Sequence, residues 1–376
     1  MKLVLKRLIA VAAAALALVG SAQAGVPKVN GRAFFVVDGT TGDVLAQHAA
    51  DTRLPIASIT KLMTVLVALE HVRLADIVTV QRDAAEVGES TIHLRAGERI
   101  SVRELLAGAL IQSANDAADA LADYVGHGND RAFVALMNAE ARRLGLSRTH
   151  FVRPDGLDAP GHVSTARDVT RLAQELMKRP VVRALVRERS AVIAGGRTLH
   201  TWNDLLGVFR GLVGVKTGHT GAAGWCQVAE VRRDGLDVYA TILGSPTRGE
   251  RNGELAALLR WAFSVERPAW VIAPGRVYVR VATGFGRAAV PLVPARPVLR
   301  AVRVDRPLRE LVVAPAAADL PVRRGDRLGE VRVFSGRRLV GRAPLVAARS
   351  VSRPGFFGKL GFYGGRTLSH IGGWFG

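Results

Sequence analysis

Cysteine and long apolar runs are nearly absent from this sequence of 376 residues. It contains one cysteine, Cys226, so no disulfide can form within the chain. Beyond the first 24 residues, no segment holds the roughly 20 continuous apolar residues that a membrane-spanning helix needs. These absences exclude a disulfide-stapled scaffold and a multi-spanning membrane protein. Cys226 lies in the apolar run GWCQVAEV, which predicts a buried core thiol.

The N-terminus is predicted to be a secretory signal peptide. Residues 1–24 have a basic start, an apolar stretch and the small-residue ending Ala22-Gln23-Ala24. Because the apolar stretch is short, we expect cleavage after Ala24 rather than retention as a membrane anchor. The mature protein is therefore expected in the periplasm or at the outer face of the cytoplasmic membrane.

Acidic residues are few relative to basic ones, and the formal net charge of the chain is +20. Residues 266–353 contain eighteen arginines, no lysine and six acids, a net charge of +12, whereas residues 25–265 carry only +3. This contrast predicts two domains, of which the second faces an anionic surface. Because an exported protein seldom meets nucleic acid, we expect a membrane or a cell-wall polymer and no nucleic-acid partner.

Hydrophobic periodicity predicts an α+β fold for residues 25–265. Hairpins are expected at 33–48 and 225–243, with a closing helix near residue 263. Helical spacing fills the interval between them, at residues 58–71, 102–112, 116–125, 130–144 and 165–178. Strands at both ends imply one antiparallel sheet that is flanked by helices and carries an inserted helical subdomain. Residues 266–353, with short alternating strands punctuated by proline and glycine, predict a small all-β domain.

The C-terminal residues 354–376 form a separate amphipathic segment. On a helical wheel nearly all their aromatic and aliphatic residues fall on one arc, with Lys359, Arg366 and His370 along its edge. Eight glycines disfavour a helix in water. We expect this tail to fold when its aromatic face enters a membrane interface, and packing against the protein is the alternative.

Ser58 and Lys61, in PIASITKLMT, are the first candidate catalytic pair. On a helix the two side chains share a face one turn apart, so the amine can reach the serine hydroxyl. Burial among apolar neighbours favours neutral lysine, which can act as a general base and so activate serine as a nucleophile. An N-cap serine with a snorkelling lysine is the structural alternative, because one such spacing is expected by chance in a chain of this length.

Two further motifs decide against that alternative. QSANDAADALADYV places Ser113 and Asn115 in a tight turn between helices, and VGVKTGHTGAAGW places Lys216, Thr217 and Gly218 at the end of an apolar stretch. Gly218 would allow a substrate backbone to approach closely. The order Ser-x-x-Lys, Ser-x-Asn and Lys-Thr-Gly is far more specific than any of the three motifs alone.

With these motifs the sequence resembles the penicillin-binding serine acyltransferases, and within them the low-molecular-mass D-alanyl-D-alanine carboxypeptidases. The likeness runs from about residue 30 through the tail and includes GLDAPGHVSTARD as well as the three motifs. It implies a β-lactamase/transpeptidase-like fold, peptidoglycan stem pentapeptide as substrate and β-lactam antibiotics as covalent inhibitors. No metal or other cofactor is expected.

The resemblance also implies a role for each motif residue. Ser58 would attack the carbonyl between the terminal D-alanines and Lys61 would take its proton, while Ser113 with Lys216 would return a proton to the leaving amine. The remaining residues would bind the substrate. Asn115 would hold its amide, and a backbone N–H of His219 would bind the oxyanion. Arg251 would pair with the terminal carboxylate, and the strand along which the substrate binds would contain Thr217, Gly218 and Thr220. Arg248 is an alternative to Arg251, and a solvated surface charge is another interpretation of either.

Three rival functions follow from the same residues. A β-lactamase of class A needs a loop glutamate for rapid deacylation, yet LGLSRTHFVRPDGLDAPGHVS contains none, and Ala114 stands where that class has aspartate. We therefore expect penicillin to acylate Ser58 and to leave slowly. The second rival is an endopeptidase that cuts peptidoglycan cross-links, and the third is a catalytically silent wall-binding scaffold.

Overall fold

The computed structural model describes residues 9–16 and 25–356. They divide into two compact units, residues 24–264 and the chain from residue 265 onward, the latter joined by the N-terminal strand β1 (Ile9–Leu16). Most of the expected amphipathic tail lies outside the described residues. Within the described residues no helix is long and apolar enough to cross a membrane.

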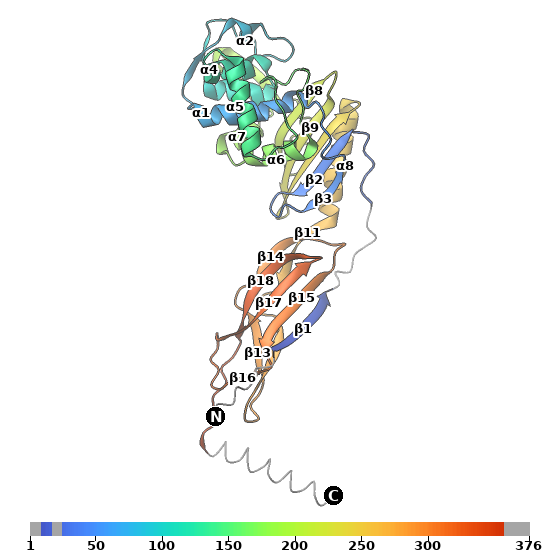
Figure 1. Ribbon diagram of the computed structural model, residues 1–376, viewed down its shortest axis with the longest axis vertical. Helices are drawn as coiled ribbons and strands as arrows, with labels where there is room; N and C mark the ends of the chain where they lie inside the picture. Colours follow the sequence, from blue (N-terminus) through green and yellow to red (C-terminus); the bar gives the residue numbers. More distant parts are fainter. Residues whose placement is uncertain (1–8, 17–24, 357–376) are drawn as a thin grey trace, which may run out of the picture. The chain divides into compact units, whose positions relative to one another are not determined.

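The first unit is built on a five-stranded antiparallel sheet (Figure 1). Its order is β3-β2-β10-β9-β8, so the first strands of the unit pair with its last. Phe35 in β2 lies opposite Thr241 in β10, 206 residues further along the chain. The strands are β2 (Ala33–Asp38), β3 (Val44–His48), β8 (Leu212–Thr220), β9 (Gly224–Arg233) and β10 (Leu236–Ser245). The predicted α+β fold is therefore confirmed.

Helices fill the long insertion between β3 and β8 and close the unit after β10. All six residues of β2 are buried, which requires cover on both faces of the sheet. On one face, Ala33, Phe35 and Val37 belong to the same apolar core as buried residues of α1 and α6. Helix α8 follows β10 in the chain. The helices are α1 (Lys61–His71), α2 (Arg82–Glu86), α3 (Val102–Ala107), α4 (Asn115–Gly126), α5 (Asp130–Arg143), α6 (Ala166–Leu176), α7 (Pro180–Leu185) and α8 (Arg248–Val265).

Short elements complete this unit. A 3₁₀ turn at Ala57–Thr60 precedes α1, a π-helical turn at Gly108–Gln112 follows α3, and another 3₁₀ turn spans Ala194–Gly196. Two small two-stranded sheets complete the list: β4 (Ile77–Thr79) pairs with β5 (Arg99–Ser101), which lies beyond α2 in the chain, and β6 (Ser190–Ile193) forms a hairpin with β7 (Arg197–His200).

The second unit is all-β, as predicted. Its larger sheet has the order β1-β15-β17-β18-β13-β12-β16, and β11 pairs with β14 in a smaller one. The strands are β11 (Glu266–Ile272), β12 (Val279–Thr283), β13 (Val290–Pro294), β14 (Val298–Arg303), β15 (Leu308–Pro315), β16 (Ala317–Ala318), β17 (Arg327–Ser335) and β18 (Arg338–Ala347). Strand β1 belongs to the expected signal peptide, so its removal would leave β15 as an edge strand.

Candidate active site

The turn that carries Ser58 sits directly before α1. Ser58 lies in the 3₁₀ turn Ala57–Thr60 and Lys61 is the first residue of α1. In a 3₁₀ turn, side chains three residues apart are eclipsed, so the two face the same side. Lys61 Nζ lies 2.9 Å from Ser58 Oγ. The turn is also strained, because Ala57 has a φ of 49°, which is uncommon for a residue with a Cβ.

Lys61 is fully buried and its amine has three neighbours. Nζ lies 2.7 Å from Asn115 Oδ1 and 2.6 Å from the carbonyl oxygen of Asp155, in addition to Ser58. Burial lowers the pKa of Lys61 to about 8, although the nearby Asp155 carboxylate opposes this effect. A neutral amine has two N–H groups, and the two carbonyl-type oxygens can only accept. Its lone pair is then free to accept a proton from the Ser58 hydroxyl.

A second serine–lysine pair faces the first. The π-helical turn after α3 ends at Ser113, whose φ of 64° turns the chain into α4. Lys216 Nζ, from β8, donates to Ser113 Oγ at 2.8 Å and to the Thr217 carbonyl at 2.8 Å. Burial, reinforced by the positive charges of Lys61 and Arg251, holds the pKa of Lys216 well below its usual value. Ser113 therefore lies beside a lysine that gives up its proton readily.

Strand β8 passes close to the Ser58 turn because residue 218 is glycine. A Cβ at Gly218 would lie 2.9 Å from the Ile56 carbonyl oxygen and 3.1 Å from the Ser58 nitrogen. Such distances are shorter than real Cβ contacts, so any side chain here would push β8 away from the nucleophile. Gly218 also lines the cavity, so the predicted approach of a substrate stays a prediction, and the close packing of the Ser58 turn is a second reason for glycine here.

One cavity of about 260 Å³ collects these side chains. Its lining residues are Ser58, Glu89, Ser90, Ser113, Asn115, Trp202, Thr217, Gly218, His219, Trp225 and Arg251. Lys61 and Lys216 are buried and bond to Ser58 and Ser113 of that lining. Thr220 does not line the cavity, and its hydroxyl donates instead to Asp158 Oδ1 at 2.6 Å.

Arg251 is a buried residue of the cavity wall and not a solvated surface charge. Its side chain is 1% exposed, and Nη2 donates to Asp204 Oδ2 at 3.1 Å. Burial lowers the pKa of Arg251 to about 10, and Asp204 opposes this. Arg248 pairs with the same Asp204 but is 39% exposed and does not line the cavity. Of these two arginines, the structure brings Arg251 to the site.

Several contributors could not be seen in the sequence. Asp155 serves Lys61 through its main-chain carbonyl, which any residue type could supply. Trp202 reaches the cavity from a segment without a functional motif, and Trp225 ends the Lys-Thr-Gly stretch without having been singled out. The backbone carbonyl of Ser90 accepts a hydrogen bond from the backbone N–H of Asn115 at 2.6 Å, and this contact again does not depend on the side chain of Ser90.

The fold and this geometry define the class of protein. A serine hydroxyl beside a buried lysine, with a second serine–lysine pair across the cavity, is the arrangement of a serine hydrolase whose base is lysine. Residues 20–247 match the family model described as D-alanyl-D-alanine carboxypeptidase. The chain belongs to this family of serine peptidases.

Relatives with similar sequences carry the same description. The D-alanyl-D-alanine carboxypeptidase DacC of Escherichia coli is 33% identical over 360 residues, covering 89% of this chain and 87% of that protein. DacF of Bacillus subtilis is 28% identical, with 85% and 86% covered. Among solved structures, DacD of Francisella tularensis has a TM-score of 0.66 at 25% identity, with 88% of this chain and 95% of that one covered. The Streptomyces K15 DD-transpeptidase has a TM-score of 0.61 at 32% identity, with 64% and 100% covered.

Proposed function

We propose that this protein is a serine D-alanyl-D-alanine carboxypeptidase that removes the terminal D-alanine from peptidoglycan stem pentapeptides. The observation that carries the proposal is the 2.9 Å approach of the buried Lys61 amine to Ser58 Oγ at a cavity lined by Arg251. Family membership over residues 20–247 supports the same reaction. Ser58 is the nucleophile and neutral Lys61 is its base.

The reaction proceeds in two halves. Ser58 Oγ attacks the carbonyl carbon between the two D-alanines while Lys61 takes the hydroxyl proton. The backbone N–H groups of Ser58 and His219 stabilise the oxyanion, and each donor of this kind is typically worth about 3 kcal/mol. The C–N bond then breaks, and Ser113, supplied by Lys216, protonates the leaving amine. Water hydrolyses the ester and regenerates Ser58.

Arg251 gives the reaction its carboxypeptidase character. A guanidinium recognises a carboxylate through paired N–H donors, and Arg251 is the arginine in the cavity lining. Asn115 orients the substrate amide and Thr217 lies on the strand that the substrate follows. The adjacent Asp204 neutralises Arg251 only in part, because it also pairs with Arg248.

Mass spectrometry after brief exposure to penicillin tests the nucleophile. A β-lactam presents a strained amide to the same serine, so the wild-type protein should gain one adduct that Ser58→Ala lacks. No glutamate lies in the 144–164 loop to speed deacylation, so the adduct should persist. Release of D-alanine from a soluble pentapeptide by wild type is the matching assay of the reaction. An adduct on both proteins, or on neither, contradicts the assignment of Ser58.

We also propose that the protein is exported and works at the outer face of the cytoplasmic membrane. The signal-peptide pattern of residues 1–24 and the peptidoglycan substrate support export. The tail at 354–376 would hold the enzyme at the membrane, and the all-β unit would act as a spacer or as a contact with anionic polymer.

A further inference from the structure

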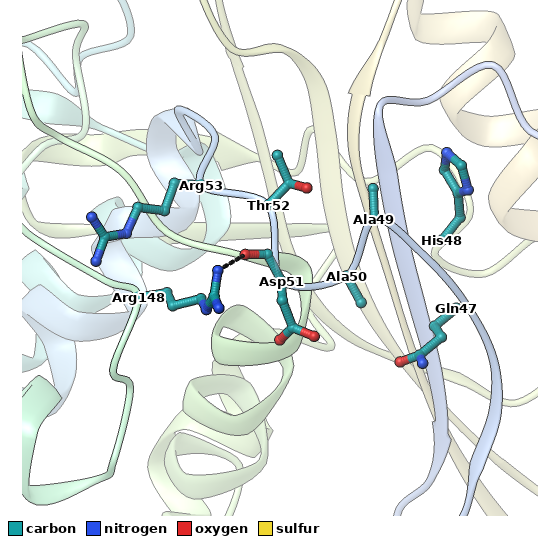
Figure 2. Close-up of a pocket in the computed structure, with 8 residues that line it drawn as sticks. All are labelled: Gln47, His48, Ala49, Ala50, Asp51, Thr52, Arg53 and Arg148. Atoms are coloured by element: carbon teal, nitrogen blue, oxygen red, sulfur yellow. Dashed lines mark hydrogen bonds between the residues drawn. The ribbon is translucent and has the colours of Figure 1, made fainter.

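A second cavity lies in the first unit, at the turn that follows β3 (Figure 2). It measures about 750 Å³, and residues 47–53 line it together with Arg148. It shares no lining residue with the cavity at Ser58. The catalytic machinery described above therefore leaves this cavity unused, and we name it the Arg53–Arg148 cavity.

An ion pair and backbone hydrogen bonds hold the loop that forms this cavity. Arg167 binds the Asp51 carboxylate through both oxygens, at 2.8 and 3.0 Å, and donates to Gln47 Oε1 at 2.7 Å. Leu54 and Ser164 exchange two backbone hydrogen bonds, at 2.8 and 2.9 Å. Because both ends of the loop are held, the cavity is a preformed surface feature and binding there would cost little ordering entropy.

The charges in the cavity are unbalanced. Asp51 is its one carboxylate, and that group is already paired with Arg167. Arg148 donates from Nη1 to the Asp51 carbonyl oxygen at 3.2 Å, and the Asp51 carboxylate that feels its charge is shared with Arg167. Arg53 forms no hydrogen bond or ion pair with any residue of the described chain. Figure 2 shows Arg53 extending away from the loop, while Arg148 reaches toward the loop from another segment and contacts Asp51. Two guanidinium groups are therefore available to an anion.

We propose that the Arg53–Arg148 cavity is an exosite that binds carboxylates of the polymeric substrate beyond the stem being cut. The inference rests on the proposed function and names the form of substrate that the enzyme prefers. Arginine recognises carboxylates through paired N–H donors. Arg53 precedes Ser58 by five residues, so at most about 18 Å of chain separates the exosite from the nucleophile. A polymer carries many stems that end in carboxylates, so a neighbouring stem could bind here while one is cut, whereas a soluble pentapeptide has a single terminal carboxylate, which Arg251 would hold.

Charge reversal at the cavity tests the exosite. The variant is Arg53→Glu/Arg148→Glu, and the matched control is Arg103→Glu/Arg131→Glu, which makes the same charge change at exposed positions of α3 and α5. Each protein is assayed on purified peptidoglycan rich in pentapeptide stems and on a soluble pentapeptide. We expect kcat/KM on the polymer to fall about tenfold for the cavity variant alone, as for the loss of two exposed ion pairs. Its kcat/KM on the soluble peptide should stay within about twofold of wild type.

Salt and the soluble peptide separate the remaining outcomes. Because exposed charges are screened by salt, the difference on the polymer should shrink at about 0.5 M NaCl. An equal loss on both substrates would show damage to the fold, and no loss on the polymer would show solvated arginines; either result overturns the exosite. If wild type releases D-alanine from neither substrate, the proposed function fails, whereas an active wild type with an unaffected cavity variant refutes the exosite alone.

Discussion

At the scale of single residues, Asp119 is a half-buried acid whose charge acts on the candidate base Lys61. It lies on α4 one helical turn after Asn115, which itself bonds Lys61. Its Oδ1 is buried and has no hydrogen-bond partner within the described chain. Burial raises the pKa of Asp119 to about 8, the Asp155 carboxylate adds to this, and Lys61 and Arg153 oppose it. Asp119 is therefore protonated at neutral pH, close to a lysine that titrates in the same range.

Replacing this carboxyl should change the pH dependence of acylation. Ionised Asp119 stabilises the Lys61 ammonium, which is inactive as a base, so Asp119→Asn removes a counter-charge and lowers the pKa of Lys61. The acid limb of the penicillin acylation rate should move to lower pH, with the gain in rate near and above pH 8, where Asp119 ionises. At neutral pH the carboxyl is already protonated, so the rate there should change little. Stopped-flow measurement of the acylation rate from about pH 5 to about pH 10 gives the pKa of this acid limb directly.

The neighbouring acids provide the control for this shift. Asp155, Arg153 and Asp130 also act on Asp119, and they are unchanged in the variant. Asp123→Asn removes another α4 carboxyl, whose pKa burial and Asp130 raise to about 6, and it should leave the limb in place. An acid limb that is identical in wild type and Asp119→Asn would show that Asp119 does not act on the base.

From the residues alone, the sequence predicted the contact between side chains that are close together along the chain. Ser58 and Lys61 are three residues apart, and any helical turn brings them together. Lys216 meets Ser113 across 103 residues, and only the resemblance to a family implied that contact. Asp119 gave no signal, because a carboxylate on an amphipathic helix is ordinarily a solvated one. How far Asp119 is buried depends on how α4 packs against the rest of the unit, and the spacing of residues along one helix does not contain that information.

At the scale of elements, the loop at 153–163 braces the site from two sides. Its Asp155 carbonyl holds Lys61, and the Pro154 carbonyl accepts from Thr64 at 2.5 Å. Further along, Asp158 accepts from the Thr220 hydroxyl at 2.6 Å and from the Ala222 backbone N–H at 3.0 Å. The same loop thus connects the base in α1 to the turn between β8 and β9.

Removing the hydrogen bonds of Asp158 to Thr220 and Ala222 should make the turn between β8 and β9 less stable. Asp158→Ala deletes two hydrogen bonds at a partly exposed position, each worth about 1 kcal/mol, so the melting temperature of the first unit should fall by about 4–8 °C. The penicillin acylation rate should fall about tenfold, since β8 carries His219 and Thr217. Asp158→Asn keeps one acceptor oxygen and should give intermediate values. Thermal denaturation and acylation rates of the three proteins measure this, and a melting temperature equal to wild type would contradict it.

The positions of the longer helices were predictable, whereas the short helices α2 and α7 and the inner details of the long ones were not. The helix expected at 58–71 begins as a 3₁₀ turn that places Ser58, and the one expected at 102–112 ends in a π-helical turn. Apolar periodicity tolerates such changes, because tightening or widening one turn moves few side chains off the buried face. The strand pairs β4–β5 and β6–β7 escaped prediction, since strands of three or four residues carry too little alternation.

At the scale of the whole molecule, basic charge is concentrated in the all-β unit. Acids of this unit are engaged: Arg276 pairs with Glu310, Arg303 with Asp305, and Arg332 and Arg342 with Glu330. With eighteen arginines and six acids in residues 266–353, arginines outnumber the acids that could neutralise them. The composition predicted this excess directly, whereas what the unit binds depends on which arginines share a surface.

We propose that the C-terminal segment and this arginine charge are two separable routes to a membrane. Deleting residues 354–376 from the mature chain should reduce co-sedimentation with vesicles of about one-quarter phosphatidylglycerol by at least about tenfold, because the segment supplies a cluster of aromatic anchors. Trp374→Ser/Phe375→Ser should reproduce much of the loss, and Lys359→Ala/Arg366→Ala should reproduce less. Residual binding by the deleted chain should vanish at about 0.5 M salt, since it rests on arginine charge alone. Undiminished, salt-resistant binding after the deletion would refute anchoring by the tail.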